Sequence, residues 1–168
     1  MVKYADAPSA EVEAEITAAP SAVWAHLVDI SLPARFSDEF QGAEWLDDAG
    51  PALGARFRGH NKHPKGFEWH VECLVTAFEP DSVFEWTVGD PANKVARWRF
   101  DLAPTTDGST LRFSAEMGPG PSGLTPAIER MPDREDEIVE RRLDDWRANM
   151  RRTVDGIAAL AEGRDPAS

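Results

Sequence analysis

The chain has 168 residues, of which 42% are hydrophobic, and it carries a formal net charge of −12 at pH 7. This apolar content excludes a disordered chain. The acidic balance disfavours general binding to nucleic acids or anionic membrane surfaces, because both rely on Lys and Arg. One cysteine cannot form an internal disulfide, and no apolar run is long enough for a signal peptide or a membrane span. A cytoplasmic protein without membrane insertion is therefore expected.

The N-terminal third predicts a tail, a strand and two short helices. Residues 1–10 read as a flexible tail. Residues 11–17 alternate strictly, with Val12, Ala14 and Ile16 between glutamates, which is typical of a half-buried strand. Pro20 suits the first turn of a helix over residues 20–30. A second short helix or helical turn is expected within residues 31–40.

Residues 42–118 predict antiparallel strands separated by turns, because apolar residues occupy alternate positions and charged residues lie between them. Hairpins paired so that the apolar faces coincide also bring opposite charges face to face, which stabilises a pair of strands. The predicted registers place Phe57 opposite Cys73 and Trp86 opposite Trp98. The charged cross-strand neighbours are Arg58 with Glu72, Lys62 with Glu68, Glu85 with Arg99, Arg97 with Glu116, and Asp101 with Arg112.

The C-terminal part begins with a Gly- and Pro-rich segment over residues 118–134, with a helical turn expected from Thr125. A long helix follows to about residue 161. Its apolar stripe lies at helical spacing: Val139, Leu143, Trp146, Met150, Val154, Ile157 and Leu160. The whole pattern predicts a single domain over residues 11–162, followed by a short tail over 163–168.

The stretch ITAAPSAVWAHLVDI resembles the opening of the polyketide cyclase/dehydrase-like family of the START/Bet v1-like (SRPBCC) superfamily. The strands SVFEWTV and STLRFSAEM and the C-terminal helix are also similar to it. The resemblance implies an α+β helix-grip fold, in which a curved antiparallel sheet of about seven strands wraps around the long helix. It further implies a cavity between sheet and helix that binds hydrophobic small molecules such as lipids or polyketides.

The inward-facing aromatic residues are the candidate lining of that cavity, although they would equally serve as plain core. A buried indole N–H needs a hydrogen-bond partner, which a ligand or a water molecule could supply. The candidate ligand-binding residues, taken from the strands and the C-terminal helix, are Trp69, Val71, Cys73, Phe84, Trp86, Trp98, Phe100, Phe113, Met117, Leu143, Trp146 and Met150.

The stretch GHNKHPKGFEWHVEC holds three of the four histidines and the only cysteine, which are potential zinc ligands. Its spacing matches no standard zinc pattern. In the predicted register His60 and His70 share the solvent face, His63 lies at the turn, and Cys73 points to the opposite face. We therefore expect no metal and no cofactor, with Cys73 as a core residue and His26 at the rim of the first helix.

Three functions remain open at this point. The first is binding of a hydrophobic or aromatic small molecule. The second is a cyclase or dehydratase of the polyketide type. Its catalytic residues are unknown and would lie outside the inward strand positions, for example among Glu129, Arg130 and Asp133. The third is a protein-interaction module that uses an apolar patch of Leu74, Phe78 and Val83 on the outer sheet face. The ligand, the oligomeric state and a lid role for residues 118–134 stay undetermined.

Overall fold

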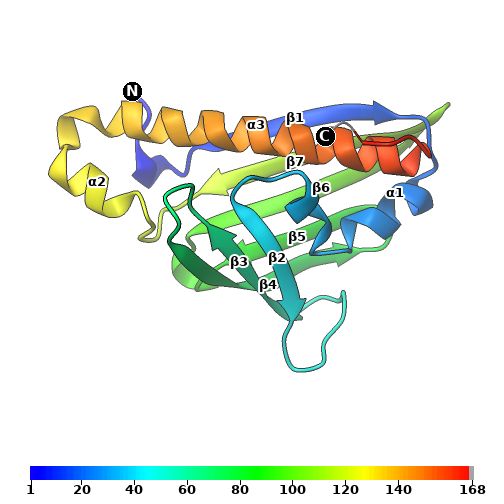
Figure 1. Cartoon of the computed structure of the whole chain (residues 1–168), viewed down its shortest axis with the longest axis horizontal. Coiled ribbons are helices and arrows are strands. Elements are labelled where there is room, and N and C mark those ends of the chain that lie inside the picture. Colours follow the sequence, from blue (N-terminus) through cyan, green and yellow to red (C-terminus); the bar gives the residue numbers. More distant parts are fainter. Residues whose placement is uncertain (167–168) are drawn as a thin grey trace.

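The computed structural model describes residues 1–166 and shows one antiparallel sheet packed against a long C-terminal helix (Figure 1). The seven strands lie in the order β1-β7-β6-β5-β4-β3-β2. A curved sheet of seven strands with this helix is the expected helix-grip fold. The strands are β1 Ser9–Ile16, β2 Phe40–Trp45, β3 Arg56–Lys62, β4 Glu68–Glu79, β5 Val83–Val88, β6 Ala96–Thr105 and β7 Gly108–Met117.

Two short helical elements follow β1, as predicted: the helix α1, Pro20–Leu27, and the 3-10 turn η2, Leu32–Arg35. The segment between β7 and the last helix contains α2, Thr125–Arg130, and the 3-10 turn η4, Pro132–Arg134. The long helix α3 spans Glu135–Ala161, and its apolar stripe is buried against β1 and α1 (Figure 1). Within residues 1–166, no helix combines the length and apolarity needed to cross a membrane.

The predicted registers of three hairpins are confirmed. Phe57 pairs with Cys73 and His60 with His70 between β3 and β4. Trp86 pairs with Trp98 between β5 and β6, and Arg97 pairs with Glu116 between β6 and β7. The sheet consequently has an apolar inner face, which faces α1 and α3, and a polar outer face.

A β-bulge in β4 moves one residue to the face opposite to the predicted one. Val75 pairs with Trp86, but the next pair is Ala77 with Glu85, so Thr76 is the extra residue. The side chain of Phe78 therefore turns to the inner face, where its ring lies 5.4 Å from that of Trp24. The expected outer patch of Leu74, Phe78 and Val83 is wrong in this respect, because an inserted residue reverses the alternation.

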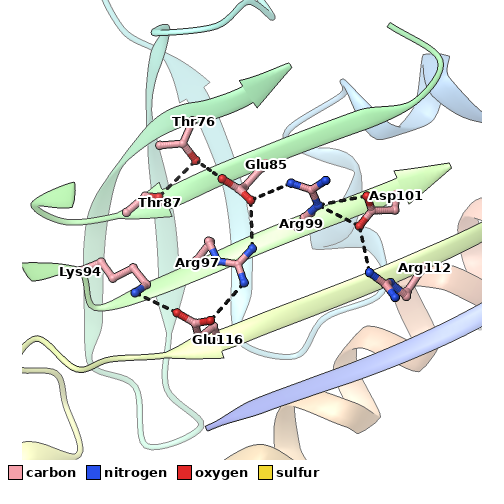
Figure 2. Close-up of polar contacts among 9 residues, drawn as sticks. All are labelled: Thr76, Glu85, Thr87, Lys94, Arg97, Arg99, Asp101, Arg112 and Glu116. Atoms are coloured by element: carbon pink, nitrogen blue, oxygen red, sulfur yellow. Dashed lines mark hydrogen bonds and ion pairs between the residues drawn. The ribbon is translucent and has the colours of Figure 1, made fainter. Parts of the chain in front are cut away.

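The outer face of β5, β6 and β7 carries a continuous network of ion pairs (Figure 2). Glu85 lies at its centre and accepts hydrogen bonds from Arg97 at 3.0 Å and Arg99 at 3.1 Å. Partial burial raises the pKa of Glu85, but its bonds with Thr76 and the two arginines outweigh this, so the pKa is held below its ordinary value. Glu116 has a lowered pKa for similar reasons, with Lys94 and Arg97 as partners.

The first residues form an ordered clasp instead of the expected flexible tail. Tyr4 begins the 3-10 turn η1, Tyr4–Asp6, and is buried. Its hydroxyl donates to the carbonyl of Gly120 at 2.6 Å, and its backbone N–H donates to Glu135 at 2.9 Å. Lys3 forms an ion pair with the same carboxylate at 3.0 Å. The buried ring of Tyr4 and the three polar contacts of Tyr4 and Lys3 fix this segment. The sequence of the segment shows no periodic pattern that would predict this.

The chain beyond α3 was expected to be a tail over residues 163–168. The helix ends at Ala161, and residues 163–166 form no helix or strand. Residues 167–168 lie outside the described part of the chain.

The bulge in β4 predicts unequal effects of two substitutions within this strand. Phe78→Ala should lower the free energy of unfolding by about 3 kcal/mol, because it removes a ring packed between Trp24 and Phe84. Leu74→Ala on the outer face should cost less than about 1 kcal/mol. Denaturant unfolding of both variants measures the difference, and equal costs would contradict the bulge.

The network on the outer face predicts loss of stability in acid. A carboxylate with a lowered folded-state pKa stabilises the fold above the ordinary value of 4.5, and this contribution is lost as the pH falls through the folded-state pKa. The melting temperature should therefore drop below about pH 4.5. Glu85→Gln should lower it at pH 7 and flatten its dependence on pH. Glu13→Gln, which changes an exposed glutamate of β1, is the control and should leave the profile unaltered.

Candidate functional site

The twelve candidate ligand-binding residues all lie on the inner face of the sheet or on the apolar stripe of α3. Four of them, Trp69, Val71, Trp86 and Trp98, are only half-buried. The other eight are buried and belong to the hydrophobic core: Cys73, Phe84, Phe100, Phe113, Met117, Leu143, Trp146 and Met150.

Three of these residues, Trp86, Trp98 and Trp146, form what we call the indole cluster. Trp86 and Trp98 are cross-strand neighbours on β5 and β6, near the middle of the sheet. The ring of Trp146 on α3 lies 4.7 Å from that of Trp98, so the cluster joins the helix to the sheet. Central strands normally bury their inner-face residues. The half-burial of both sheet tryptophans shows that solvent reaches the inner face at this point.

The indole nitrogens of the cluster have no acceptor among residues 1–166. Over residues 1–166, none of the tryptophans donates a side-chain hydrogen bond, and the one sealed side-chain nitrogen or oxygen without a partner is Nε of Arg58. Each indole N–H of the cluster is therefore in contact with solvent-accessible space. This holds even for Trp146, whose side chain is otherwise buried at 8% exposure.

The aromatic residues behind the cluster are tightly packed core. The rings of Phe100 and Phe113 stack at 4.1 Å, and Trp86 lies within 6.3 Å of Phe113. Two surface hollows, of about 330 and 370 Å³, lie elsewhere: one on the outer face of β1 and β7, the other at the turn between β6 and β7. Neither hollow is lined by a candidate residue.

The histidines and the cysteine of the β3–β4 hairpin lie on opposite faces of the sheet, as predicted. His60 is exposed and its Nε2 lies 3.2 Å from a carboxylate oxygen of Glu44. Cys73 is buried, and burial, with a smaller effect of Glu72, raises the pKa of its thiol to about 12. Over residues 1–166 no three His, Cys, Asp or Glu side chains gather closely enough to hold a metal ion.

The remaining candidates belong to helical segments and not to the sheet. His26 is half-buried on α1. Glu129, Arg130 and Asp133 are exposed on α2 and η4.

An ion pair beside the cluster was not predicted. Arg142, one helical turn before Trp146, donates two hydrogen bonds to the carboxylate of Glu39, at 3.0 and 2.8 Å. Burial lowers the pKa of Arg142, but the bonds to Glu39 more than offset this and the net shift is upward. The two residues are 103 positions apart, so no local pattern signals the contact. The pair ties α3 to the start of β2.

The inner-face strand positions of residues 1–166 hold no His, Asp, Glu, Lys or Arg. Proton transfer needs such a group within hydrogen-bond reach of the reacting atom. The site therefore offers apolar walls, aromatic faces and indole donors, which are features of a binding surface.

The fold and this aromatic inner face define a helix-grip protein. The family model described as polyketide cyclase/dehydrase and lipid transport matches residues 7–162, and the chain belongs to this family. No curated protein sequence matches the chain.

Solved structures show the same fold. The Polyketide_cyc-like protein Cgl2372 of Corynebacterium glutamicum is 25% identical, with a TM-score of 0.63 over 95% of this chain and 97% of its own. The di-domain ARO/CYC StfQ from the steffimycin biosynthetic pathway is 11% identical, with a TM-score of 0.66 over 92% of this chain and 51% of StfQ. Ara h 8.0201 is 13% identical, with a TM-score of 0.54 over 88% of this chain and 97% of its own.

The raised pKa of Cys73 predicts an inert thiol. At pH 8 the folded protein should react very slowly with a disulfide reagent that attacks thiolates, because a buried thiol with a pKa of about 12 is almost fully protonated. The guanidinium-unfolded chain, as the control, should be labelled rapidly and completely. Rapid labelling of the folded protein would show that the thiol is accessible and ionised.

Proposed function

We propose that the protein binds an apolar or aromatic small molecule, lipid-like or polyketide-like, on the inner face of the sheet beside α3. The half-burial of Trp86 and Trp98 is the observation that carries this proposal. An apolar surface left in contact with water at the centre of a sheet gains free energy when a ligand covers it, at roughly 25 cal/mol per Å².

The indole cluster suits a flat ligand. Aromatic rings prefer offset or tilted contacts, and each such pair contributes about 0.5–1.5 kcal/mol beyond the area that it buries. Trp98 and Trp146 already contact each other, with ring centroids 4.7 Å apart, so a ligand would cover them as a pair.

The enzymatic alternative, a cyclase or dehydratase, has less support. Its acid or base would have to come from outside the inner-face strand positions. Arg142, one helical turn from Trp146, is held in a bidentate pair with Glu39. Although burial lowers it, the pair holds the pKa of the guanidinium above its ordinary value, so Arg142 is a poor proton donor at neutral pH.

The interaction alternative also loses support. The predicted outer patch lacks Phe78, and the adjoining strands present ion pairs that are satisfied within the chain. Charges that are already paired within the chain offer a partner few free groups for ion pairs.

The proposal is tested with the neutral hydrophobic dye N-phenyl-1-naphthylamine, whose emission rises in apolar sites. The dye should bind to the protein and quench its tryptophan emission. Trp98→Phe should weaken dye binding by roughly two- to tenfold, because an aromatic contact of the site is diminished.

The matched control is Trp24→Phe, whose indole packs against Phe78 and Phe84. It should leave dye affinity unchanged. Circular dichroism and the melting temperature of each variant verify folding. Failure of the dye to bind, or equal affinity of the wild type and of folded Trp98→Phe and Trp86→Phe, refutes the proposal.

A further inference from the structure

The polar groups of the indole cluster are all donors. An indole nitrogen donates one hydrogen bond and accepts none. Trp86, Trp98 and Trp146 thus present three N–H groups to solvent-accessible space without an acceptor from the protein. A ligand that covers the cluster removes water from these groups, and each one left unbonded would then oppose binding.

Two hydroxyl groups near the inner face already donate hydrogen bonds within the chain. The hydroxyl of Thr153 donates to the carbonyl of Asn149 at 3.0 Å, and the hydroxyl of Ser109 donates to that of Ala18 at 2.6 Å. The thiol of Cys73 is buried. Asn61 faces inward at the hairpin end of β3, opposite Trp69, and is the one amide on these strand positions.

The positive charge beside the site is also engaged within the chain. The guanidinium of Arg142 is held by both oxygens of Glu39. Within residues 1–166, the inner-face strand positions carry no Lys, Arg or His. An anionic ligand would lose its hydration without gaining a cation, which is costly in an apolar surrounding.

Building on the proposed binding function, we infer that the indole cluster selects planar, uncharged ligands that carry a hydrogen-bond acceptor, such as a ring ketone or ether oxygen. Pure hydrocarbons leave the indole donors unbonded. Carboxylates lack a counter-charge. The three tryptophans are thereby specificity-determining residues, and their N–H groups distinguish ligands of equal shape.

Three ligands of nearly equal shape separate these cases. Fluorene has no acceptor, 9-fluorenone has a carbonyl, and 9-fluorenecarboxylate is an anion. In a purely apolar site fluorene binds more tightly than fluorenone, because the ketone loses its hydrogen bonds to water. In a site lined by donors the order is reversed. The sign of the affinity difference between fluorenone and fluorene therefore shows whether the site offers hydrogen-bond donors.

The experiment is displacement of N-phenyl-1-naphthylamine by each ligand. Fluorenone should bind about fivefold more tightly than fluorene, as expected for one net hydrogen bond. The carboxylate should bind most weakly. In Trp98→Phe or Trp86→Phe the ratio of fluorenone to fluorene affinity should fall for at least one variant. In Trp24→Phe the ratio should stay at its wild-type value. Use of the ratio cancels the general loss of ring contact in each variant.

The outcomes are distinguishable. If fluorene binds as tightly as fluorenone or more tightly, or the carboxylate binds best, the inference fails while the proposed binding function stands. A preference for fluorenone that survives unchanged in both cluster variants also overturns it. If the dye does not bind to the folded protein, there is nothing to displace and the proposed function itself fails.

Discussion

The pairing register of the sheet determines both faces of the molecule at once. Side chains alternate across a strand, so a shift of one residue would exchange the apolar face with the charged one. On the outer face, Glu85 bonds to arginines of β6, which keeps β5 and β6 aligned. The same alignment brings Trp86 beside Trp98 on the inner face. The ion pairs are half-exposed and individually weak, but together with the apolar face they favour the observed register over a shift of one residue.

Much of the sheet could be predicted because its signals are local and repeated. Alternation identified the strands, and the charges identified registers such as Arg58 with Glu72. The bulge at Thr76 could not be predicted, because Thr is compatible with either face and nothing nearby marks an extra residue. The clasp of Tyr4 and the bond between Glu39 and Arg142 were missed for another reason. Both depend on contacts more than 100 positions apart, which only the folded chain defines.

The candidate site was likewise predictable only in part. Sequence alternation correctly assigned Trp86, Trp98 and Phe100 to the inner face, yet it could not separate core from accessible wall. Phe100 is buried at 2% exposure, whereas Trp86 and Trp98 are half-buried. The difference depends on how α1 and α3 together cover the sheet, and this is a property of the whole fold. Because α3 packs mainly along β1, the strands in the middle of the sheet receive less cover (Figure 1).

The clasp at the N-terminus has a practical consequence for handling the protein. Tyr4 and Lys3 hold the two ends of the segment between β7 and α3, at Gly120 and Glu135. A purification tag or fusion partner joined directly to the first residue would crowd these contacts and disturb the connection that carries α2. Just after α3, Glu162 accepts two hydrogen bonds from Thr17. A C-terminal tag should therefore follow the last residue and not the end of the helix.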